Sequence, residues 1–344
     1  MTIIAQPTGD LSRAGHRLGQ DTGELMPLHI EEYGGEVESQ FVKRSIVREY
    51  FTLKTIRGTD TVTNDRIGKT QLQKVVPGVR PESFAPQFDN ISVKVDTIVL
   101  ARSNTHLLED FTEHYSVRTE LGKDHGKEIG KFFDEAFMVQ GVKASQIVIG
   151  DGTLGTVQAP DGFQSGTQID MDDPEDELDP DLLLRKIEDA VQTLDEKEVE
   201  SGEAVIFVRP AQFRVLARND KLISSDYSTG NGDRAKGTVL EAVGIRIVQT
   251  NRLPNVVHTG VGDDNHYLSN AGNNFAYNVT QRDTECVCLI ISPKALLAGE
   301  TIPLTSKVYY VEQEMQWFID SYLAFAATPN RAEHSAGVYK KIDV

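Results

Sequence analysis

Residues 106–142 read HLLEDFTEHYSVRTELGKDHGKEIGKFFDEAFMVQGV and carry the strongest helical signal in the chain. Apolar side chains recur there at spacings of three and four residues, and no proline interrupts them. These side chains are Leu108, Phe111, Tyr115, Ile129, Phe132, Phe133, Ala136 and Phe137. The stretch predicts a single helix of roughly 50 Å, at 1.5 Å per residue, which is long for the core of a globular domain.

Three glycines, Gly122, Gly126 and Gly130, share one face of this predicted helix. Each costs about 1 kcal/mol relative to alanine in a helix interior. Close backbone packing or a built-in bend explains that cost, and drift at an exposed surface explains it equally well. As a hypothesis we treat them as a hinge, so that alanine at all three positions favours the straight helix. We expect His114 and His125 to lie on the exposed, polar side of the same helix.

Residues 47–100, which precede the helix, predict a long hairpin. The outgoing limb, Val47 to Ile56, is rich in β-branched and aromatic residues. The returning limb alternates, with Ile91, Val93, Val95, Thr97 and Val99 on one face. The tip between the limbs is rich in glycine and proline. Such a projection cannot bury itself, so it predicts a partner surface.

The hairpin is positively charged within an acidic chain. From Arg48 to Arg80 there are seven basic and three acidic residues, a net charge of +4, whereas the whole chain carries −17. We therefore expect Arg66, Lys69 and Lys74 to contact an acidic surface of a neighbouring subunit. The alternative is that these cations only keep an exposed edge from aggregating.

The rest of the chain alternates between helix and strand signals and predicts an α+β fold. Residues 1–30 predict an extended arm, and Ile30–Ile46 a short helix interrupted at Gly34 and Gly35. Asp179 and Pro180 are typical of a helix N-terminus. Further signals predict strands at 204–208, 244–249 and 284–291, a helix at 211–217, and an apolar or alternating stretch at 306–327.

Composition limits the functions available to the 344 residues. No run approaches the ~20 apolar residues of a membrane span, and no secretory signal is visible at the start. Thirty-five basic against fifty-two acidic residues argue against broad adhesion to DNA. The two cysteines, Cys286 and Cys288, are interpreted as reduced thiols in a buried strand.

No motif in the chain predicts catalysis or a cofactor. Gly150–Gly155 has the spacing GxGxxG, but no helix can follow it, so we interpret it as a loop. The acidic run Asp170–Asp179 lacks the glycine of a calcium loop and is interpreted as solvated. The eight histidines are scattered, and none is paired with a nucleophile. We expect no enzyme activity, no cofactor and no metal.

Several stretches, in family order, resemble the major capsid proteins of short-tailed phages of the coliphage T-seven group. Each is weak alone, and their collinearity carries the resemblance. They are Tyr33–Phe41 with Arg44 and Ser45, Val75–Gly78, Ala204–Pro210 with Phe213, Gly237–Val248, and Asn330–Val338.

The resemblance implies the Hong Kong 97-type coat fold. Its parts would be an N-terminal arm (1–46), an E-loop hairpin (47–95), a P domain with its spine helix (96–150), an A domain (151–298) and a C-terminal return to the P domain (299–344). The implied protein forms hexamers and pentamers of an icosahedral head around double-stranded DNA, which it does not bind specifically.

The resemblance also implies partners and a location. These are a scaffolding protein during assembly, a portal protein at one vertex, assembly in the bacterial host cytoplasm and a final place in the virion. An encapsulin-like shell and a nucleotide-binding enzyme are the alternatives. Some coats of this fold join a lysine to an asparagine covalently, and here Lys69 or Lys74 with Asn330 and Glu333 would be the candidates. The resembled family does not cross-link, so we expect no such bond.

Overall fold

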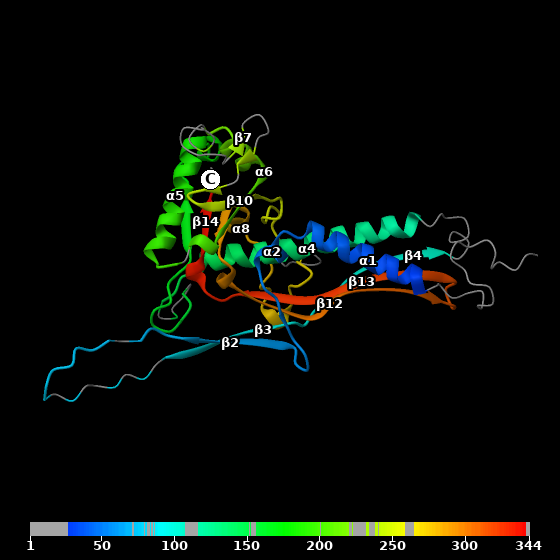
Figure 1. The fold of residues 1–344 in the computed structure, drawn as a ribbon, viewed down its shortest axis with the longest axis horizontal. Helices are drawn as coiled ribbons and strands as arrows, with labels where there is room; N and C mark the ends of the chain where they lie inside the picture. The colour runs from blue at the N-terminus through cyan, green and yellow to red at the C-terminus, as the bar shows by residue number, and fades with distance from the viewer. Residues whose placement is uncertain are drawn as a thin grey trace, which may run out of the picture. The chain divides into compact units, whose positions relative to one another are not determined.

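The computed structural model describes residues 27–70, 72–78, 80, 83, 85, 87–106, 116–150, 152, 156–199, 201–219, 222, 232–233, 238–239, 241–258 and 265–341. These residues form two compact units. The first draws on the ranges Met1–Ser45, Ile98–Lys131 and Ile302–Leu323, and the second on Ile46–Thr97, Phe132–Thr301 and Ala324–Val344. The predicted arm residues 1–26 lie outside the described residues. Figure 1 shows the elements coloured along the chain.

The first unit combines two helices with paired strands. It contains α1 (Pro27–Arg44), β4 (Val99–His106) and the N-terminal part of α4 (Ser116–Gln146). Strand β13 (Gln316–Pro329) pairs antiparallel with β4 from Gln316 to Leu323, and β12 (Leu296–Val311) is its other neighbour. Buried Val37 and Ile319 pack together with the half-buried Leu121, Leu304 and Val308.

Helix α1 corrects the prediction of a helix broken at Gly34 and Gly35. It runs without interruption through both glycines. Val37 and Phe41 on α1 are almost fully buried. Tertiary packing of this apolar stripe outweighs the propensity cost of about 1 kcal/mol for each glycine.

Helix α4 confirms most of the predicted long helix but not its start. His106 is the last residue of strand β4, and the helix runs from Ser116 to Gln146. Leu108, Phe111, Tyr115 and His114 lie outside the described residues. His125 is buried rather than exposed. Its Nε2 lies 2.7 Å from Ser103 Oγ on β4. Burial lowers the pKa of His125, so the imidazole is neutral at physiological pH.

All three glycines of α4, Gly122, Gly126 and Gly130, are buried. Gly126 and Gly130 differ in how closely neighbouring atoms approach them. A Cβ added to Gly126 would lie 2.5 Å from the backbone oxygen of Val37 and 3.3 Å from the backbone nitrogen of Phe41. A Cβ added to Gly130 would meet its nearest atom at 3.5 Å, an ordinary contact. Close approach of α1 therefore explains Gly126, while the hinge role of the three glycines stays a hypothesis.

We predict opposite effects for alanine at these two positions. Gly126→Ala should destabilise the chain by about 1–3 kcal/mol, because backbone atoms must move. Gly130→Ala should stabilise it by about 0.5–1 kcal/mol through helix propensity alone. Denaturant unfolding of the unassembled full chain measures both. Equal effects of the two substitutions would contradict the steric account.

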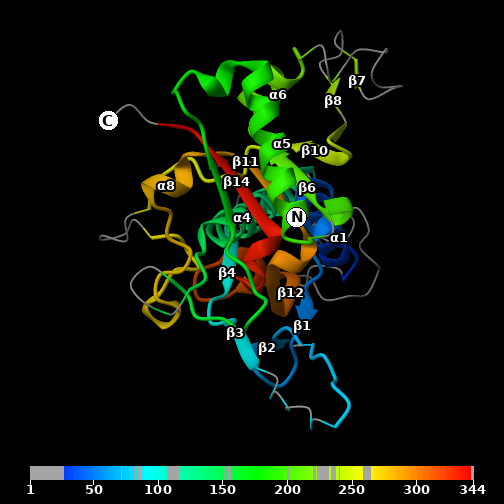
Figure 2. The same cartoon turned by 90° about the vertical axis from the view of Figure 1, so that its left-hand side faces the viewer.

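The second unit is built on a mixed six-stranded sheet in the order β5-β14-β11-β6-β10-β9. Strands β11 and β6 are antiparallel, and β6 and β10 are parallel. Figure 2 shows α5 lying across this sheet. The strands are β5 (Thr167–Asp170), β6 (Val205–Val208), β9 (Glu241–Ala242), β10 (Ile245–Gln249), β11 (Cys286–Ile291) and β14 (Ser335–Tyr339).

Helix α5 (Pro180–Glu196) covers one face of the sheet and begins as predicted. Asp179 is its N-cap, and the carboxylate accepts from the backbone N–H groups of Asp181 and Leu182. Its buried side chains join Ile206 and Ile290 in the main core. The predicted strands around 204–208, 244–249 and 284–291 and the helix α6 (Pro210–Leu216) are confirmed.

The C-terminal part of α4 lies against the other face of the sheet. A Cβ at Gly141 would come within 3.1 Å of Leu289 and Ile291 on β11. Ser335 on β14 donates to the Gly141 carbonyl at 3.0 Å. Because both faces are covered, β6 and β11 are buried at every residue. Cys286 lies there as a free thiol, as does Cys288, and burial raises the pKa of Cys286 to about 12.

The hairpin consists of β2 (Thr61–Ile67) and β3 (Phe88–Lys94), paired antiparallel from Thr61–Lys94 to Ile67–Phe88. The predicted outgoing limb, Val47–Ile56, is wrong. It contains the short helix α2 (Val47–Tyr50) and the two-residue strand β1 (Lys54–Thr55).

A carboxylate far along the chain explains that error. Asp134 on α4 is fully buried and accepts from the backbone N–H groups of Ile46 at 2.9 Å and Val47 at 3.3 Å. These are N–H groups at the start of α2, which no helical partner satisfies. Local β-propensity is overridden at this point by a partner 87 or 88 residues away.

The remaining described elements are short. They are β7 (Gly232–Asp233), β8 (Thr238–Val239), α8 (Gln281–Thr284) and the 3-10 turns Asp176–Leu178, Ser201–Glu203, Ala271–Asn273, Pro293–Ala295 and Ala332–His334. Of the GxGxxG stretch, Asp151 and residues 153–155 lie outside the description. Within the described part of the chain, no helix is both long and apolar enough to cross a membrane.

One half-buried histidine in the second unit predicts sensitivity of the fold to acid. His266 stacks on Phe132 at a centroid distance of 4.9 Å and on Tyr277 at 5.5 Å. Its Nδ1 accepts from the Leu268 N–H. Burial, with His258 and Lys143 nearby, lowers the pKa of His266 to about 4.

We predict that the second unit loses stability as the pH falls from about 6.5 to 4. In that window the unfolded chain binds a proton at His266 that the folded chain excludes, which amounts to about 3 kcal/mol at most. Thermal unfolding across this pH range should show the loss. His266→Phe keeps the stacking and should reduce the pH dependence. An unchanged pH profile in this variant would exclude His266 as the source.

Candidate assembly site

The tip of the hairpin is exposed throughout its described length. Every described residue from Lys69 to Gln87 is exposed. Among them are apolar side chains that a solvated loop would not need: Leu72 is 96% exposed, Val75 68% and Val76 48%. An apolar segment left uncovered at the end of a projection is typical of an interaction surface.

Lys69 and Lys74 lie in this exposed segment. Their contact with a neighbouring subunit stays a prediction. Arg48, Lys54, Arg57 and Arg80 are exposed as well. The tip therefore combines apolar side chains with the cationic Lys69, Lys74 and Arg80.

Arg66 does not belong with them. Its side chain is only 8% exposed and forms an ion pair with Asp89 on the opposite strand. Its Nη1 donates to the Asn330 carbonyl at 2.8 Å. The guanidinium in turn lowers the pKa of Asp89. The charge of Arg66 is thus used inside the subunit, near the end of the paired strands where the tip begins.

The tip begins where the paired strands end, at Gly68 and Gln87. We call this point the root, and it is bonded to the turn at Pro160–Phe163. The Lys69 N–H donates to the Asp161 carbonyl at 2.7 Å, and the Asp161 N–H donates to Gln87 Oε1 at 2.9 Å. Gly162 has a φ of +96°, and a Cβ there would lie 2.6 Å from Lys69 Cβ. Only glycine fits this position, for both conformational and steric reasons.

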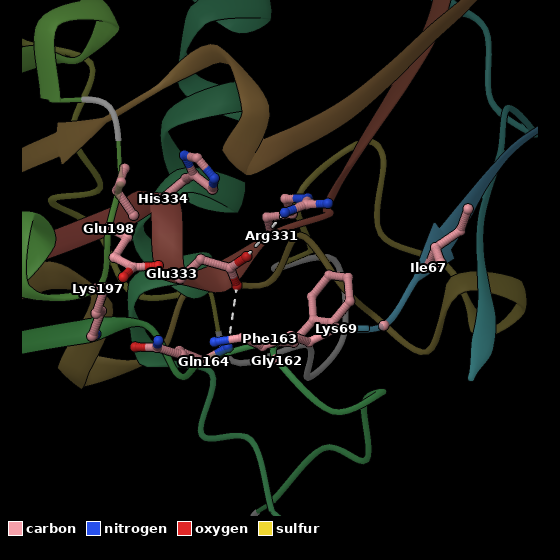
Figure 3. Close-up of a pocket in the computed structure, with 12 residues that line it drawn as sticks. Ile67, Lys69, Gly162, Phe163, Gln164, Lys197, Glu198, Arg331, Glu333 and His334 are labelled. Carbon is pink, nitrogen blue, oxygen red and sulfur yellow. Dashed lines mark hydrogen bonds and ion pairs between the residues drawn. The ribbon is translucent and has the colours of Figure 1, made fainter. Parts of the chain in front are cut away.

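A half-open pocket of about 360 Å³ lies at the root (Figure 3). In the figure Arg331 and Glu333 point toward each other beside Phe163, and their charged groups lie 3.5 Å apart. Glu333 also accepts from the Gln164 N–H at 3.4 Å. The pocket is lined by Ile67, Gly68, Lys69, Gly162, Phe163, Gln164, Lys197, Glu198, Val199, Arg331, Glu333 and His334.

Sequence reasoning missed the turn 160–163 and the part that Arg331 plays at the root. Pro160-Asp161-Gly162 has turn chemistry that is visible in the sequence. Nothing local, however, connects this turn to a hairpin about 90 residues earlier. Among the described residues, no group of three or more His, Cys, Asp or Glu side chains could hold a metal ion.

The structure places both candidate partners of a covalent cross-link near the root. Asn330 Oδ1 accepts from Asn64 Nδ2 at 3.1 Å, and its own Nδ2 donates to the Lys294 carbonyl at 3.4 Å. Glu333 is only 8% exposed and is held by Arg331. The Asn330 amide is thus engaged within its own subunit.

We predict that assembled particles boiled in detergent run as a single band at the 38.1 kDa of the chain. An asparagine amide held by two internal hydrogen bonds is poorly placed for attack by a lysine from elsewhere. Denaturing gel electrophoresis measures this directly. A ladder of multimers that disappears in Lys69→Arg or Lys74→Arg would contradict it.

Comparison with proteins of known structure shows the class of this fold. The chain superimposes on the mature capsid of bacteriophage PhiM1 with a TM-score of 0.71, at 21% identity, over 87% of this chain and 88% of that one. The capsid protein of the cyanophage P-SCSP1u gives a TM-score of 0.73 at 16% identity, over 98% and 100%. The fold is that of phage capsid proteins of the Hong Kong 97 type, as the resemblance implied.

Sequence comparison shows the family. Residues 93–297 match the model of the Gp10A-like major capsid proteins. The major capsid protein of Enterobacteria phage T3 is 20% identical over 253 residues, which are 71% of this chain and 70% of that protein. The chain belongs to the Gp10A-like family and is a structural phage coat protein, a component of the virion. This favours the phage coat over the encapsulin-like shell and the nucleotide-binding enzyme.

Proposed function

We propose that the chain forms the hexamers and pentamers of an icosahedral head that encloses double-stranded DNA. Family membership and the uncovered hairpin tip support this proposal. The proposed organisation is an arm at 1–46, an E-loop at 47–95, a P domain at 96–150, an A domain at 151–298 and a return to the P domain at 299–344. We further propose that no catalytic turnover and no cofactor are required.

The hairpin tip docks on a neighbouring subunit in this proposal. Burying Leu72, Val75 and Val76 would contribute affinity, since apolar area removed from water stabilises by roughly 25 cal/mol per Å². Lys69 and Lys74 would steer the tip toward an acidic surface and fix its register.

Two further partners, a scaffolding protein and a portal protein, follow from the same proposed role. A scaffolding protein would guide assembly in the host cytoplasm, and a portal protein would occupy one vertex. A net charge of −17 supports a wall that does not hold DNA through a broad cationic surface. Gly122, Gly126 and Gly130 on α4 remain the candidate hinge for a change of shell shape.

We predict that Lys69→Glu/Lys74→Glu leaves a folded subunit that fails to form closed shells. Two reversed charges at the exposed tip should slow assembly by about tenfold or more at low salt. Light scattering gives the rate, and electron microscopy shows the products. Arg66→Glu is unsuitable as a third reversal, because it would set a carboxylate against Asp89 and destabilise the hairpin itself.

Lys69→Arg/Lys74→Arg is the matched control, since it keeps both charges. It should assemble like the unmodified chain. Raising salt should slow assembly of the unmodified chain without unfolding it, because exposed pairs are screened over about 8 Å at physiological ionic strength. Normal closed shells from the double glutamate variant would exclude electrostatic docking by the tip.

A further inference from the structure

Two guanidinium groups contact one aromatic ring at the root of the hairpin. Arg66 Cζ lies 4.9 Å from the centroid of the Phe163 ring, and Arg331 Cζ lies 5.0 Å from it. Both distances are within the range of cation–π attraction. Arg66 belongs to β2, while Arg331 follows β13, so the ring joins segments that lie far apart in the sequence.

Each guanidinium is also held by a carboxylate. Arg66 pairs with Asp89 on β3, and Arg331 lies 3.5 Å from Glu333. Glu333 accepts from the N–H of Gln164, the residue after Phe163. The five side chains Asp89, Arg66, Phe163, Arg331 and Glu333 thus form one connected row, which we call the clamp.

The clamp constrains something that the backbone bonds at the root do not. Those bonds, from the Lys69 N–H to the Asp161 carbonyl and from the Asp161 N–H to Gln87 Oε1, attach the hairpin along a single line. A ribbon attached along one line can still tilt about that line. Contacts made by the Arg66 side chain, away from the backbone, oppose this tilt.

We propose that Phe163 is a positioning residue for shell assembly, acting through Arg66 to fix the direction of the hairpin. This inference rests on the proposed function, in which the hairpin tip meets a neighbouring subunit. A small tilt at the root is magnified at the tip, because the described residues from Lys69 to Gln87 project beyond it. Phe163 itself is only half-buried and lies next to charged groups.

The test separates the aromatic face from apolar volume. Phe163→Ala removes both, Phe163→Leu keeps most of the volume without the π face, and Phe163→Tyr keeps the ring. Amide hydrogen exchange of the unassembled full chain reports on β2 and β3, with β11 as an internal reference. Phe213→Ala, another half-buried phenylalanine but one packed on the main core, is the matched control.

We expect alanine and leucine at position 163 to accelerate exchange in β2 and β3 at least tenfold, which corresponds to about 1.4 kcal/mol. Exchange in β11 should stay within threefold. Tyrosine should restore both hairpin protection and normal shells, whereas Phe213→Ala should leave hairpin exchange unchanged. The alanine and leucine variants should also assemble slowly and into misshapen shells by electron microscopy.

Several results would overturn the proposal. Unchanged hairpin exchange, rescue by leucine as complete as by tyrosine, or normal shells from a loosened hairpin each do so. If Phe163→Ala does not fold, Arg331→Met takes its place, since that side chain is 42% exposed and the substitution removes only the guanidinium; the same two readouts decide.

Failure of the clamp and failure of tip docking give different patterns. If only the clamp idea fails, hairpin exchange is unaffected at position 163 while Lys69→Glu/Lys74→Glu still blocks shells. If only charge docking fails, that double variant assembles normally while Phe163→Ala still loosens the hairpin.

Discussion

The hairpin depends on one constraint, namely that β2 and β3 pair only with each other among the described strands. A two-stranded ribbon is marginally stable in water. Its register is fixed by seven cross-strand pairs, but its direction depends on the contacts of Arg66 and Lys69 with the rest of the unit. Beyond the root, exposed Leu72, Val75 and Val76 gain stability only when another surface covers them. In the proposed function, burial of these side chains and association of subunits are therefore coupled, since a partner that binds the folded hairpin stabilises it.

The first unit shows a constraint of a different kind, in which two backbones come too close for a side chain. The Gly126 position on α4 lies against the Val37 carbonyl of α1. A glycine inside a helix is easily interpreted as a source of flexibility. Here the neighbouring helix supplies a steric reason that requires no bending, and Gly130, one turn further on, lacks that reason. Identical spacing in the sequence thus conceals unequal positions in the structure.

The elements that the sequence predicted correctly are those whose local signals and tertiary packing agree. Asp179 caps α5, and the continuous apolar runs of β6 and β11 are buried on both faces. The collinear family motifs likewise gave the correct fold class, because each match needed only a few adjacent residues.

The wrong predictions share a different cause, namely contacts between residues that are far apart in the sequence. Val47–Ile56 has strand-like residues but starts with a helix, because Asp134 caps it. The contact of Arg66 with Asn330 spans 264 residues of sequence, so composition alone counted Arg66 as a free cation. His125 was placed on a polar face because the strand residue Ser103, which meets its ring, is not visible from helical periodicity. No sequence pattern around Phe163 predicted its contact with the hairpin.

Because the Arg66 side chain is buried, it does not count among the exposed charges of the segment 48–80. Within 48–80, six exposed cations remain against three exposed acidic residues, so the segment is still positive in a chain of −17. Two such chains repel each other overall, but at physiological salt that repulsion is screened beyond about 8 Å. In the proposed docking, the local pairing of a cationic tip with an acidic surface would outweigh the screened net charge at closer range, and the apolar tip residues would then be buried. On this proposal net acidity opposes indiscriminate association, while the tip selects one geometry of contact.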